Sequence, residues 1–268
     1  MGAEEGSAGE GAALFVEERQ AKILEHIAER RKATVGELCR AFRVSSATIR
    51  NDLRDLERRK LLLRTHGGAM MRSKTGQELD SSQKQVQNLE AKRRIAAAAL
   101  TMIEDGDRIV LDTGTTTLEL ARLLDRRRDL TVVTNDLAIA TLLEDFDSVN
   151  VLFIGGLLRK RFHCTVSYGN TWRETLSGLT LDKAFMGVNS LSLEKGATTP
   201  DIGTAETKKR MIELSVKVIL LCDSSKFGRS SFVRFATLDQ VDTVVTERAG
   251  EEERRQLEEL GIEVLVAE

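Results

Sequence analysis

The stretch DRIVLDTGTTTLELARLL, residues 107–124, decides how the larger part of this chain folds. A short apolar run ends at Asp112, a cluster of small residues follows, and an amphipathic pattern begins at once. A strand that passes directly into a helix is typical of an α/β sheet, whose ligands bind at the carboxyl ends of the strands. Gly114 lets the backbone approach a ligand, and the three threonines after it offer donors to an anion. A helix cap with surplus threonines explains the stretch equally well.

Similar apolar runs recur along the rest of the chain, with amphipathic stretches between them. They are LTVVT (130–134), VNVLFIGG (149–156), DKAFMGV (182–188), VKVILLCD (216–223), VDTVVT (241–246) and IEVLVA (262–267). Nearly continuous apolar strands separated by amphipathic helices predict a mostly parallel sheet that is covered on both faces. We therefore expect an α/β domain over residues 88–268, preceded by a polar linker over residues 73–87.

Polar and glycine residues follow several of these strands, so they should gather at one edge of the sheet as a ligand pocket. Lys195 and Lys226 are available as counter-charges for a phosphate, whereas the lysine and spacing of a nucleotide P-loop are missing. A phosphorylated small molecule fits this pattern better than ATP or GTP. The expected effector-binding residues are Thr113, Gly114, Thr115, Thr116, Thr117, Asn135, Gly155, Gly156, Asn189, Lys195, Gly196 and Lys226.

The N-terminal part of the chain has the opposite charge. Residues 17–74 hold fifteen Lys and Arg against eight Asp and Glu, whereas residues 75–268 hold twenty-five against thirty-one. Residues 1–16 are acidic and rich in Gly and Ala, which predicts a disordered lead-in. A basic module joined to an acidic one suggests a different partner for each.

The basic module, residues 17–72, is expected to form three short helices and a hairpin. Thr34 with Glu37 fits a capping box, and Ser45 fits the N-cap of the third helix. In that helix an apolar stripe of Ile49, Leu53 and Leu56 faces inward. The opposite face and the hairpin carry side chains suited to base edges and phosphates. The expected DNA-binding residues are Ser46, Ala47, Thr48, Arg50, Asn51, Arg54, Arg58, Arg64 and His66.

A solvated charged face on a small helical bundle is the alternative, but the tight turn before Ser45 and the net positive charge favour DNA. The run VSSATIRNDLRDLERRKLLLRTHGGAM, residues 44–70, resembles the winged helix-turn-helix of the DeoR family of bacterial transcription regulators. Residues 88–247 are similar to the effector domain of that family, which resembles ribose-5-phosphate isomerase. Asn51 stands where the family usually has a second basic residue, a difference that bears on the operator preference.

The resemblance implies a DNA-binding regulator that represses a sugar-use operon and is released by a phosphorylated sugar. The acids of the isomerase are replaced here by Asn189 and Ser190, while Lys195-Gly196 matches its Lys-Gly pair. An amide cannot serve as the carboxylate base of that reaction, so we expect no enzyme activity, although Glu194 or Asp223 could stand in. A phosphosugar isomerase with an accessory DNA-binding domain and a regulator with a vestigial pocket are the alternatives.

We further expect a homodimer or homotetramer on a double-stranded DNA operator, because a single winged helix binds weakly. No apolar run is long enough to span a membrane, and the three cysteines have no paired spacing. We therefore expect a cytoplasmic protein, nucleoid-associated when bound to DNA, with no metal or cofactor.

Overall fold

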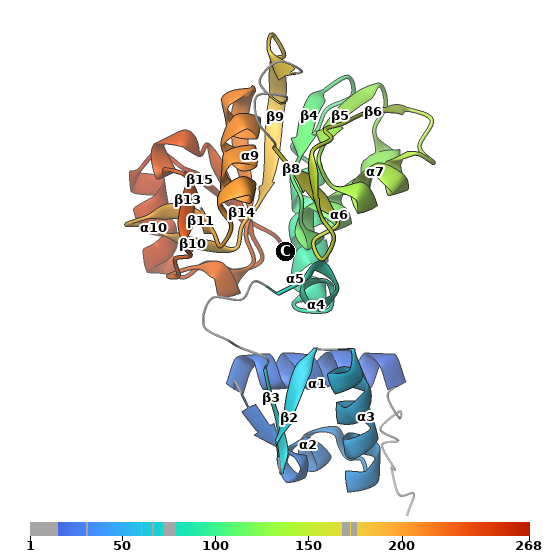
Figure 1. Cartoon of the computed structure of the whole chain (residues 1–268). Helices are drawn as coiled ribbons and strands as arrows, with labels where there is room; N and C mark the ends of the chain where they lie inside the picture. The colour runs from blue at the N-terminus through green and yellow to red at the C-terminus, as the bar shows by residue number, and fades with distance from the viewer. Residues whose placement is uncertain are drawn as a thin grey trace, which may run out of the picture. The chain divides into compact units, whose positions relative to one another are not determined.

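The computed structural model describes residues 16–30, 32–59, 61–65, 67–71, 79–167, 172 and 176–268. The chain forms two compact units, Met1–Thr75 and Gly76–Glu268, which we call the N-terminal and C-terminal units (Figure 1). The expected lead-in lies outside the described residues except for Val16, which begins the first helix. No helix in the described part of the chain is long and apolar enough to cross a membrane.

The N-terminal unit contains the three expected helices, α1 (Val16–Arg30), α2 (Val35–Phe42) and α3 (Ser46–Arg58). Both expected caps are present. The Thr34 hydroxyl accepts from the Glu37 amide (3.2 Å), and the Glu37 carboxylate accepts from the Thr34 amide (2.7 Å). The Ser45 hydroxyl accepts from the Thr48 amide (3.1 Å), which starts α3.

The wing is a sheet of three strands rather than the expected hairpin of two. Its order is β1 (Lys32–Thr34), β3 (Gly68–Met71) and β2 (Leu62–Thr65), with both pairs antiparallel. The three-residue β1 lies between two helices and is too short to show an alternating pattern, so the sequence did not predict it.

The three helices enclose a small apolar core. Ile49, Leu53 and Leu56 of α3 are at most 1% exposed, which confirms the predicted inward stripe. A buried ion pair, not expected from the sequence, joins α1 to α3: Arg19 Nε lies 2.7 Å from Asp52 Oδ2. This pair holds the inward face of α3 against α1, so the opposite face of α3 remains exposed to solvent.

The C-terminal unit is built on a seven-stranded sheet in which all pairs are parallel. Its order is β15 (Glu263–Val266), β14 (Thr243–Thr246), β12 (Ser215–Leu221), β9 (Leu181–Gly187), β4 (Arg108–Leu111), β5 (Leu130–Thr134) and β6 (Val149–Phe153). The seven apolar runs of the sequence supply these seven strands, so the predicted parallel sheet is confirmed.

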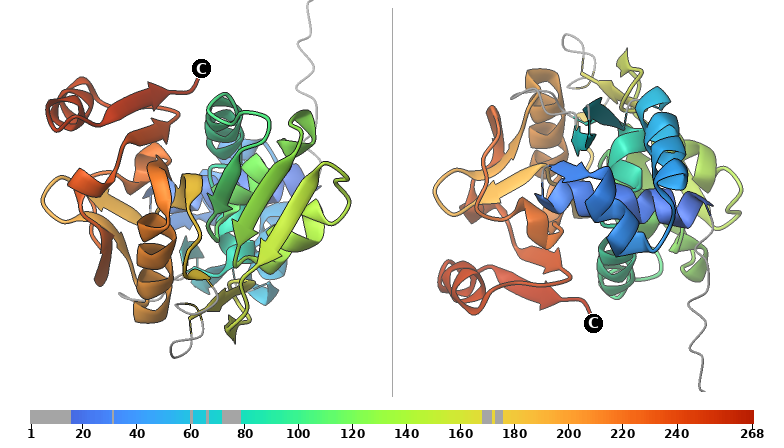
Figure 2. Two further views of the ribbon diagram at one scale, coloured as in Figure 1. Left: turned by 90° about the horizontal axis from the view of Figure 1, so that it is seen from above. Right: turned by 90° about the horizontal axis from the view of Figure 1, so that it is seen from below.

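Both faces of this sheet are covered, as the continuous apolar runs predicted (Figures 1 and 2). Side chains alternate between two cores: Ile219 and Leu221 belong to one, and Leu220 between them belongs to the other. The helices that contribute to the first core are α5 (Leu89–Leu100), α6 (Thr115–Ala121) and α7 (Leu137–Leu143). Those that contribute to the second are α9 (Ile202–Glu213) and α10 (Glu251–Glu259).

The strand order contains a switch point. From β4 the chain adds β5 and then β6 on one side, and it returns to place β9 on the other side of β4. The loops that follow β4 and β9 therefore lead away from each other at the same edge of the sheet. Such a point leaves a crevice, which is where ligands bind in open α/β sheets.

The C-terminal unit also contains two smaller sheets. One hairpin pairs β7 (Leu157–Arg159) with β8 (Cys164–Val166), and a second small sheet contains β10 (Ser190–Ser192), β11 (Gly196–Thr199) and β13 (Val233–Ala236).

The structure also differs from the expected linker over residues 73–87. Residues Ser81–Gln85 form a helix, α4, that belongs to the C-terminal unit, whereas residues 72–78 lie outside the described residues. A five-residue helix is too short to show a period in the sequence.

Candidate functional site

The outward face of α3 carries the side chains that the sequence predicted there. Ile49 and Leu53 point into the core, and the helical repeat turns the remaining predicted residues toward solvent. Thr48 is half-buried, and the exposed residues are Ser46, Ala47, Arg50, Asn51, Arg54 and Arg58.

The arginines of this surface differ in how far neighbouring acids neutralise them. Arg58 lies 2.9 Å from the Asp55 carboxylate. By contrast, Arg50 donates to the Ser46 hydroxyl (3.4 Å), and Arg54 donates to the side-chain oxygen of Asn51, which is 3.1 Å away. Both of these partners are neutral. Arg50 and Arg54 therefore keep their full charge for DNA phosphates or base edges.

The wing adds to the same surface. Arg64 on β2 lines a small cleft together with Arg50 and Leu53 of α3. Its guanidinium lies 3.8 Å from the Glu57 carboxylate, so its charge is partly offset. His66, the remaining predicted residue, lies outside the described residues.

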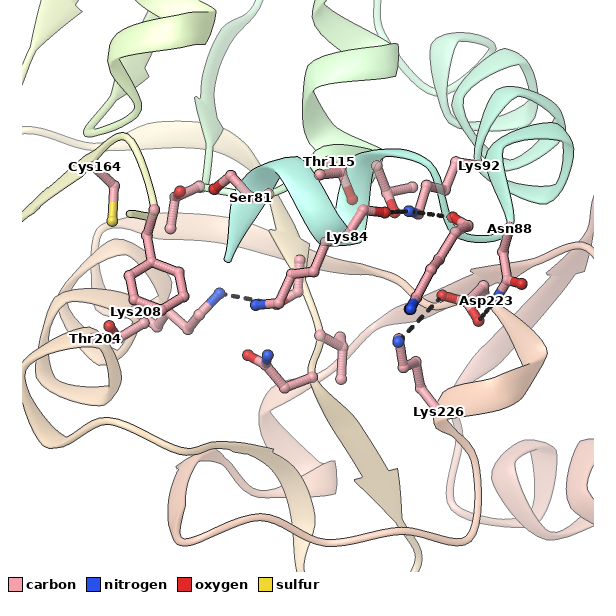
Figure 3. Close-up of a pocket in the computed structure, with 18 of the residues that line it drawn as sticks. Ser81, Lys84, Asn88, Lys92, Thr115, Cys164, Thr204, Lys208, Asp223 and Lys226 are labelled. Carbon is pink, nitrogen blue, oxygen red and sulfur yellow. Dashed lines mark hydrogen bonds and ion pairs between the residues drawn. The ribbon is translucent and has the colours of Figure 1, made fainter. Parts of the chain in front are cut away.

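In the C-terminal unit a pocket lies at the switch point between β4 and β9 (Figure 3). The loop after β4, the loop after β9, the β7–β8 hairpin, α9, the loop after β12 and the α4–α5 segment all contribute. The lining residues are Ser81, Lys84, Gln87, Asn88, Lys92, Thr113, Gly114, Thr115, Thr116, Arg159, Phe162, Cys164, Gly187, Val188, Asn189, Thr204, Lys208, Asp223 and Lys226.

Half of the predicted effector residues are among them: Thr113, Gly114, Thr115, Thr116, Asn189 and Lys226. Three others are buried or engaged beside the pocket. Thr117 is buried, and its hydroxyl donates to the Gly114 carbonyl (2.8 Å) within the first turn of α6. The Asn135 amide donates to the carbonyl of Thr165 (2.7 Å) in the interior. The Gly155 carbonyl accepts from the indole of Trp172 (2.6 Å).

The last three predicted residues serve packing and turns. A Cβ on Gly156 would approach the Val166 carbonyl oxygen to 2.2 Å, so this glycine permits close contact with β8. Lys195 lies in the turn between β10 and β11, outside the lining of the pocket that the structure describes. Gly196 has a left-handed φ of 72°, and a Cβ there would approach the Ala236 carbonyl oxygen to 2.3 Å. A glycine at the end of a strand can therefore serve close backbone packing or a left-handed turn, and need not mark a ligand site.

The sequence reasoning missed Lys208 of α9, which lies at the floor of the pocket. Its ammonium donates to the Asp112 carboxylate and, over 2.8 Å, to the Gly187 carbonyl. The Gly187 amide donates to the same carboxylate (2.9 Å). Burial raises the pKa of Asp112 above its usual value, and the nearby Lys208 opposes this. The pair joins the loops after β4 and β9 across the switch point.

Lys92 of α5 was missed too, although it is only 4% exposed. Its ammonium donates to the backbone carbonyls of Lys84 and Gln87, at the end of α4. Burial lowers its pKa to about 8. A lysine beside several alanines in an amphipathic helix gives no sign in the sequence that it will be buried.

A third charged cluster follows β12. The amide of Asn88 donates to Asp223 Oδ1 (2.9 Å), and Lys226 Nζ lies 3.7 Å from Asp223 Oδ2. Burial opposes ionisation of Asp223, but Lys226 and the hydrogen bonds outweigh it and hold the pKa of this carboxyl below its usual value. Asp223 is thus a carboxylate at neutral pH.

The pocket as a whole favours an anion. Its described lining contains five cationic side chains, Lys84, Lys92, Arg159, Lys208 and Lys226, and a single carboxylate, Asp223. The threonines of the opening stretch contribute less than expected, because α6 has only seven residues and its dipole is correspondingly small. Neutral polar groups of Thr113, Thr204 and Asn189 also line the pocket. The Thr113 hydroxyl donates to Asp136 (2.7 Å) and the Thr204 hydroxyl donates to Asp201 (2.8 Å).

Comparison with known proteins gives concordant results for both units. Residues 19–75 match the DeoR-like helix-turn-helix domain, and residues 87–248 match the DeoR C terminal sensor domain. The chain is 38% identical to the HTH-type transcriptional regulator GlpR of Haloferax volcanii, over 92% of this chain and 96% of that protein. It is 34% identical to the HTH-type transcriptional repressor GlcR of Bacillus subtilis, over 95% of this chain and 98% of that protein.

Among solved structures, ribose 5-phosphate isomerase A of Methanocaldococcus jannaschii covers 52% of this chain and 55% of its own. Its TM-score is 0.39 and its identity 18%, so this likeness is distant and partial. The two domain matches and the nearly full-length relatives show that this chain belongs to the DeoR family of transcriptional regulators.

Proposed function

We propose that this DNA-binding regulator represses a sugar-metabolism operon and that a phosphorylated sugar, bound in the C-terminal pocket, relieves the repression. The observation that supports an anionic effector is the lining of the pocket, which has five cationic side chains and one carboxylate. Two of these cations, Lys208 and Arg159, pair with Asp112 and Asp201 outside the lining, and an excess of positive charge is still left. A phosphate would contact the lysines, and the neutral groups of Thr115 and Asn189, which line the same pocket, would bind sugar hydroxyls. The relatives named as regulators and repressors agree with this role.

The DNA is bound through α3 and the wing in this proposal. Arg50 and Arg54 are exposed and paired with neutral side chains, so they are the residues expected to contribute most. A single winged helix presents few such groups. We therefore propose that a homodimer or homotetramer reads repeated half-sites, as the pairing of symmetric proteins with symmetric operators requires.

Turnover of the sugar is not part of this function. Asn189 stands at the pocket as a hydrogen-bonding amide, and its side-chain oxygen accepts from Thr199 (3.1 Å). Asp223 is the carboxylate of the described lining, but its lowered pKa makes it a weak base. The relatives that span nearly the whole chain are named as transcriptional regulators.

The experiment has two steps. Selection of bound duplexes from a randomised DNA library first gives the operator. Release of that operator is then measured by fluorescence anisotropy with glucose 6-phosphate, fructose 1-phosphate, fructose 6-phosphate, ribose 5-phosphate and glycerol 3-phosphate, each beside the unphosphorylated compound. We expect at least one phosphorylated compound, and none of the neutral ones, to release the DNA. Operator binding that no compound alters, with no thermal stabilisation by any of them, would show that the pocket is vestigial.

A further inference from the structure

The strand β6 forms one edge of the seven-stranded sheet, beside β5 (Figure 1). At its end, the Ile154 amide donates to the Thr134 carbonyl of β5 (2.8 Å). In a parallel ladder, alternate residues direct both of their backbone groups to the same neighbour, so the amides and carbonyls of Val151 and Phe153 point away from β5. Within the described part of the chain these outward groups have no hydrogen-bond partner.

The side chains along this edge are apolar and exposed. Four large ones are between 36% and 60% exposed: Leu152 and Phe153 of β6, and Leu157 and Leu158 of β7. Only residues 154–156 separate the two strands, and we call the four side chains together with the outer backbone of β6 the β6 edge. Natural edge strands are usually protected from pairing by charges or proline. Residues 149–158 contain neither, so the β6 edge is suited to pairing with another strand.

The two ends of the β6 edge carry opposite charges. Asp145 and Asp147 precede β6, whereas Lys160 and Arg161 lie in the turn between β7 and β8, and all four are exposed. None of these side chains has an ion-pair partner among the residues that the structure describes. When a strand pairs with a copy of itself antiparallel about a two-fold axis, the start of each lies beside the end of the other. Such pairing would bring the acidic end of each copy to the basic end of the other.

We infer that a second copy of this chain binds at the β6 edge, with its β6 antiparallel to this one about a two-fold axis beside Val151; this inference rests on the proposed self-association. In this register Val151 pairs with the partner's Val151, and Phe153 pairs with the partner's Val149, so the outward amides of both strands gain acceptors. The two sheets become one continuous sheet. Each copy covers part of the exposed apolar surface of the other, and the opposite charges at the ends favour the antiparallel direction.

Sedimentation equilibrium of the full chain, without DNA, first measures the dissociation constant of the parent and of Phe153→Pro. Proline removes the outward amide of β6 and leaves the ladder to β5 intact. The matched control is Val266→Pro in β15, at the opposite edge of the sheet. The Ala267 amide donates inward to the Thr246 carbonyl (2.8 Å), so the Val266 amide points outward as the Phe153 amide does. Phe153→Pro should dissociate about tenfold or more readily, because each dimer loses two donors, and Val266→Pro should match the parent.

Charge reversal then tests the antiparallel direction. One variant combines Asp145→Lys with Asp147→Lys, and a second combines Lys160→Glu with Arg161→Glu. Each places like charges together at both ends of the pairing, so each should associate more weakly than the parent at low salt. A third variant carries all four substitutions and restores opposite charges, so its dissociation constant should return to that of the parent. Misfolding caused by either pair of substitutions would not be corrected by adding the other.

The outcomes separate the two proposals. If the parent is monomeric at every concentration, the proposed self-association fails and this inference fails with it. If the parent self-associates, but Phe153→Pro and both reversal variants associate equally tightly, a different surface joins the copies and only the inference is overturned. Equal weakening by Phe153→Pro and Val266→Pro overturns it too, as does a third reversal variant that stays as weak as the first two. Should Phe153→Pro not fold, the reversal variants decide, because all four of their positions are exposed.

Discussion

Replacement of Lys208 by methionine should destabilise the C-terminal unit strongly. Lys208 and Asp112 are 2% and 0% exposed, and the ammonium is the cation that pairs with this carboxylate. Methionine keeps much of the side-chain volume but leaves the charge of Asp112 buried and unpaired. Removing one partner of a buried ion pair costs about 3–5 kcal/mol, a large share of the stability of a domain.

The measurement is urea unfolding followed by the fluorescence of Trp172. This residue is the single tryptophan of the chain, and it is buried in the C-terminal unit, so its emission reports on that unit. The matched control is Lys209→Met, one position along the same helix. Lys209 is 42% exposed and forms an exposed i,i+3 pair with Glu206, so its loss should cost less than about 0.5 kcal/mol.

The pH dependence gives a second test of the same reasoning. Burial already raises the pKa of Asp112, and loss of Lys208 removes the charge that opposes this. A carboxyl with a raised pKa in the folded state binds its proton more tightly there than in the unfolded chain. Stability is then lost as the pH rises through the folded pKa. Lys208→Met should therefore recover part of its loss when the pH falls from about 7 toward 5. A Lys208→Met protein as stable as Lys209→Met at pH 7 would refute the argument.

Three further outcomes are expected. Arg50→Ala should weaken operator binding by about 1–3 kcal/mol, or lower by about one the slope of the logarithm of the binding constant against that of the salt concentration. Arg58→Ala should have a smaller effect, because this cation pairs with Asp55. Fluorescence anisotropy at several salt concentrations compares the two variants, and equal losses would contradict the greater contribution of Arg50. Ser45→Ala should cost the N-terminal unit about 1 kcal/mol in calorimetric unfolding through loss of the α3 cap, and an unchanged transition would argue against that cap. Because burial lowers the pKa of Lys92 to about 8, calorimetry should find weaker binding of the effector above pH 8 than at pH 7; an affinity independent of pH up to 9.5 would be inconsistent with a contact to this lysine.

The sequence alone was sufficient for the elements whose signals are local. The caps at Thr34 and Ser45 and the stripe on α3 each lie within a few residues, so the winged helix could be predicted nearly complete. The seven strands were predictable because burial on both faces makes each run almost entirely apolar. The opening stretch at residues 112–117 was correctly interpreted as a strand passing into a helix, and Thr113 to Thr116 do line the pocket.

Only the tertiary structure decided which charges meet in the pocket. Lys208 and Asp112 are 96 positions apart, and Asn88 and Asp223 are 135 apart. Their meeting depends on the order of the strands, which places β9 beside β4, and strand order leaves no local pattern. Lys208 and Lys209 look alike in the sequence, yet one is buried and the other exposed. The direction in which a helix packs decides between them, and that direction is set by contacts distant in the chain.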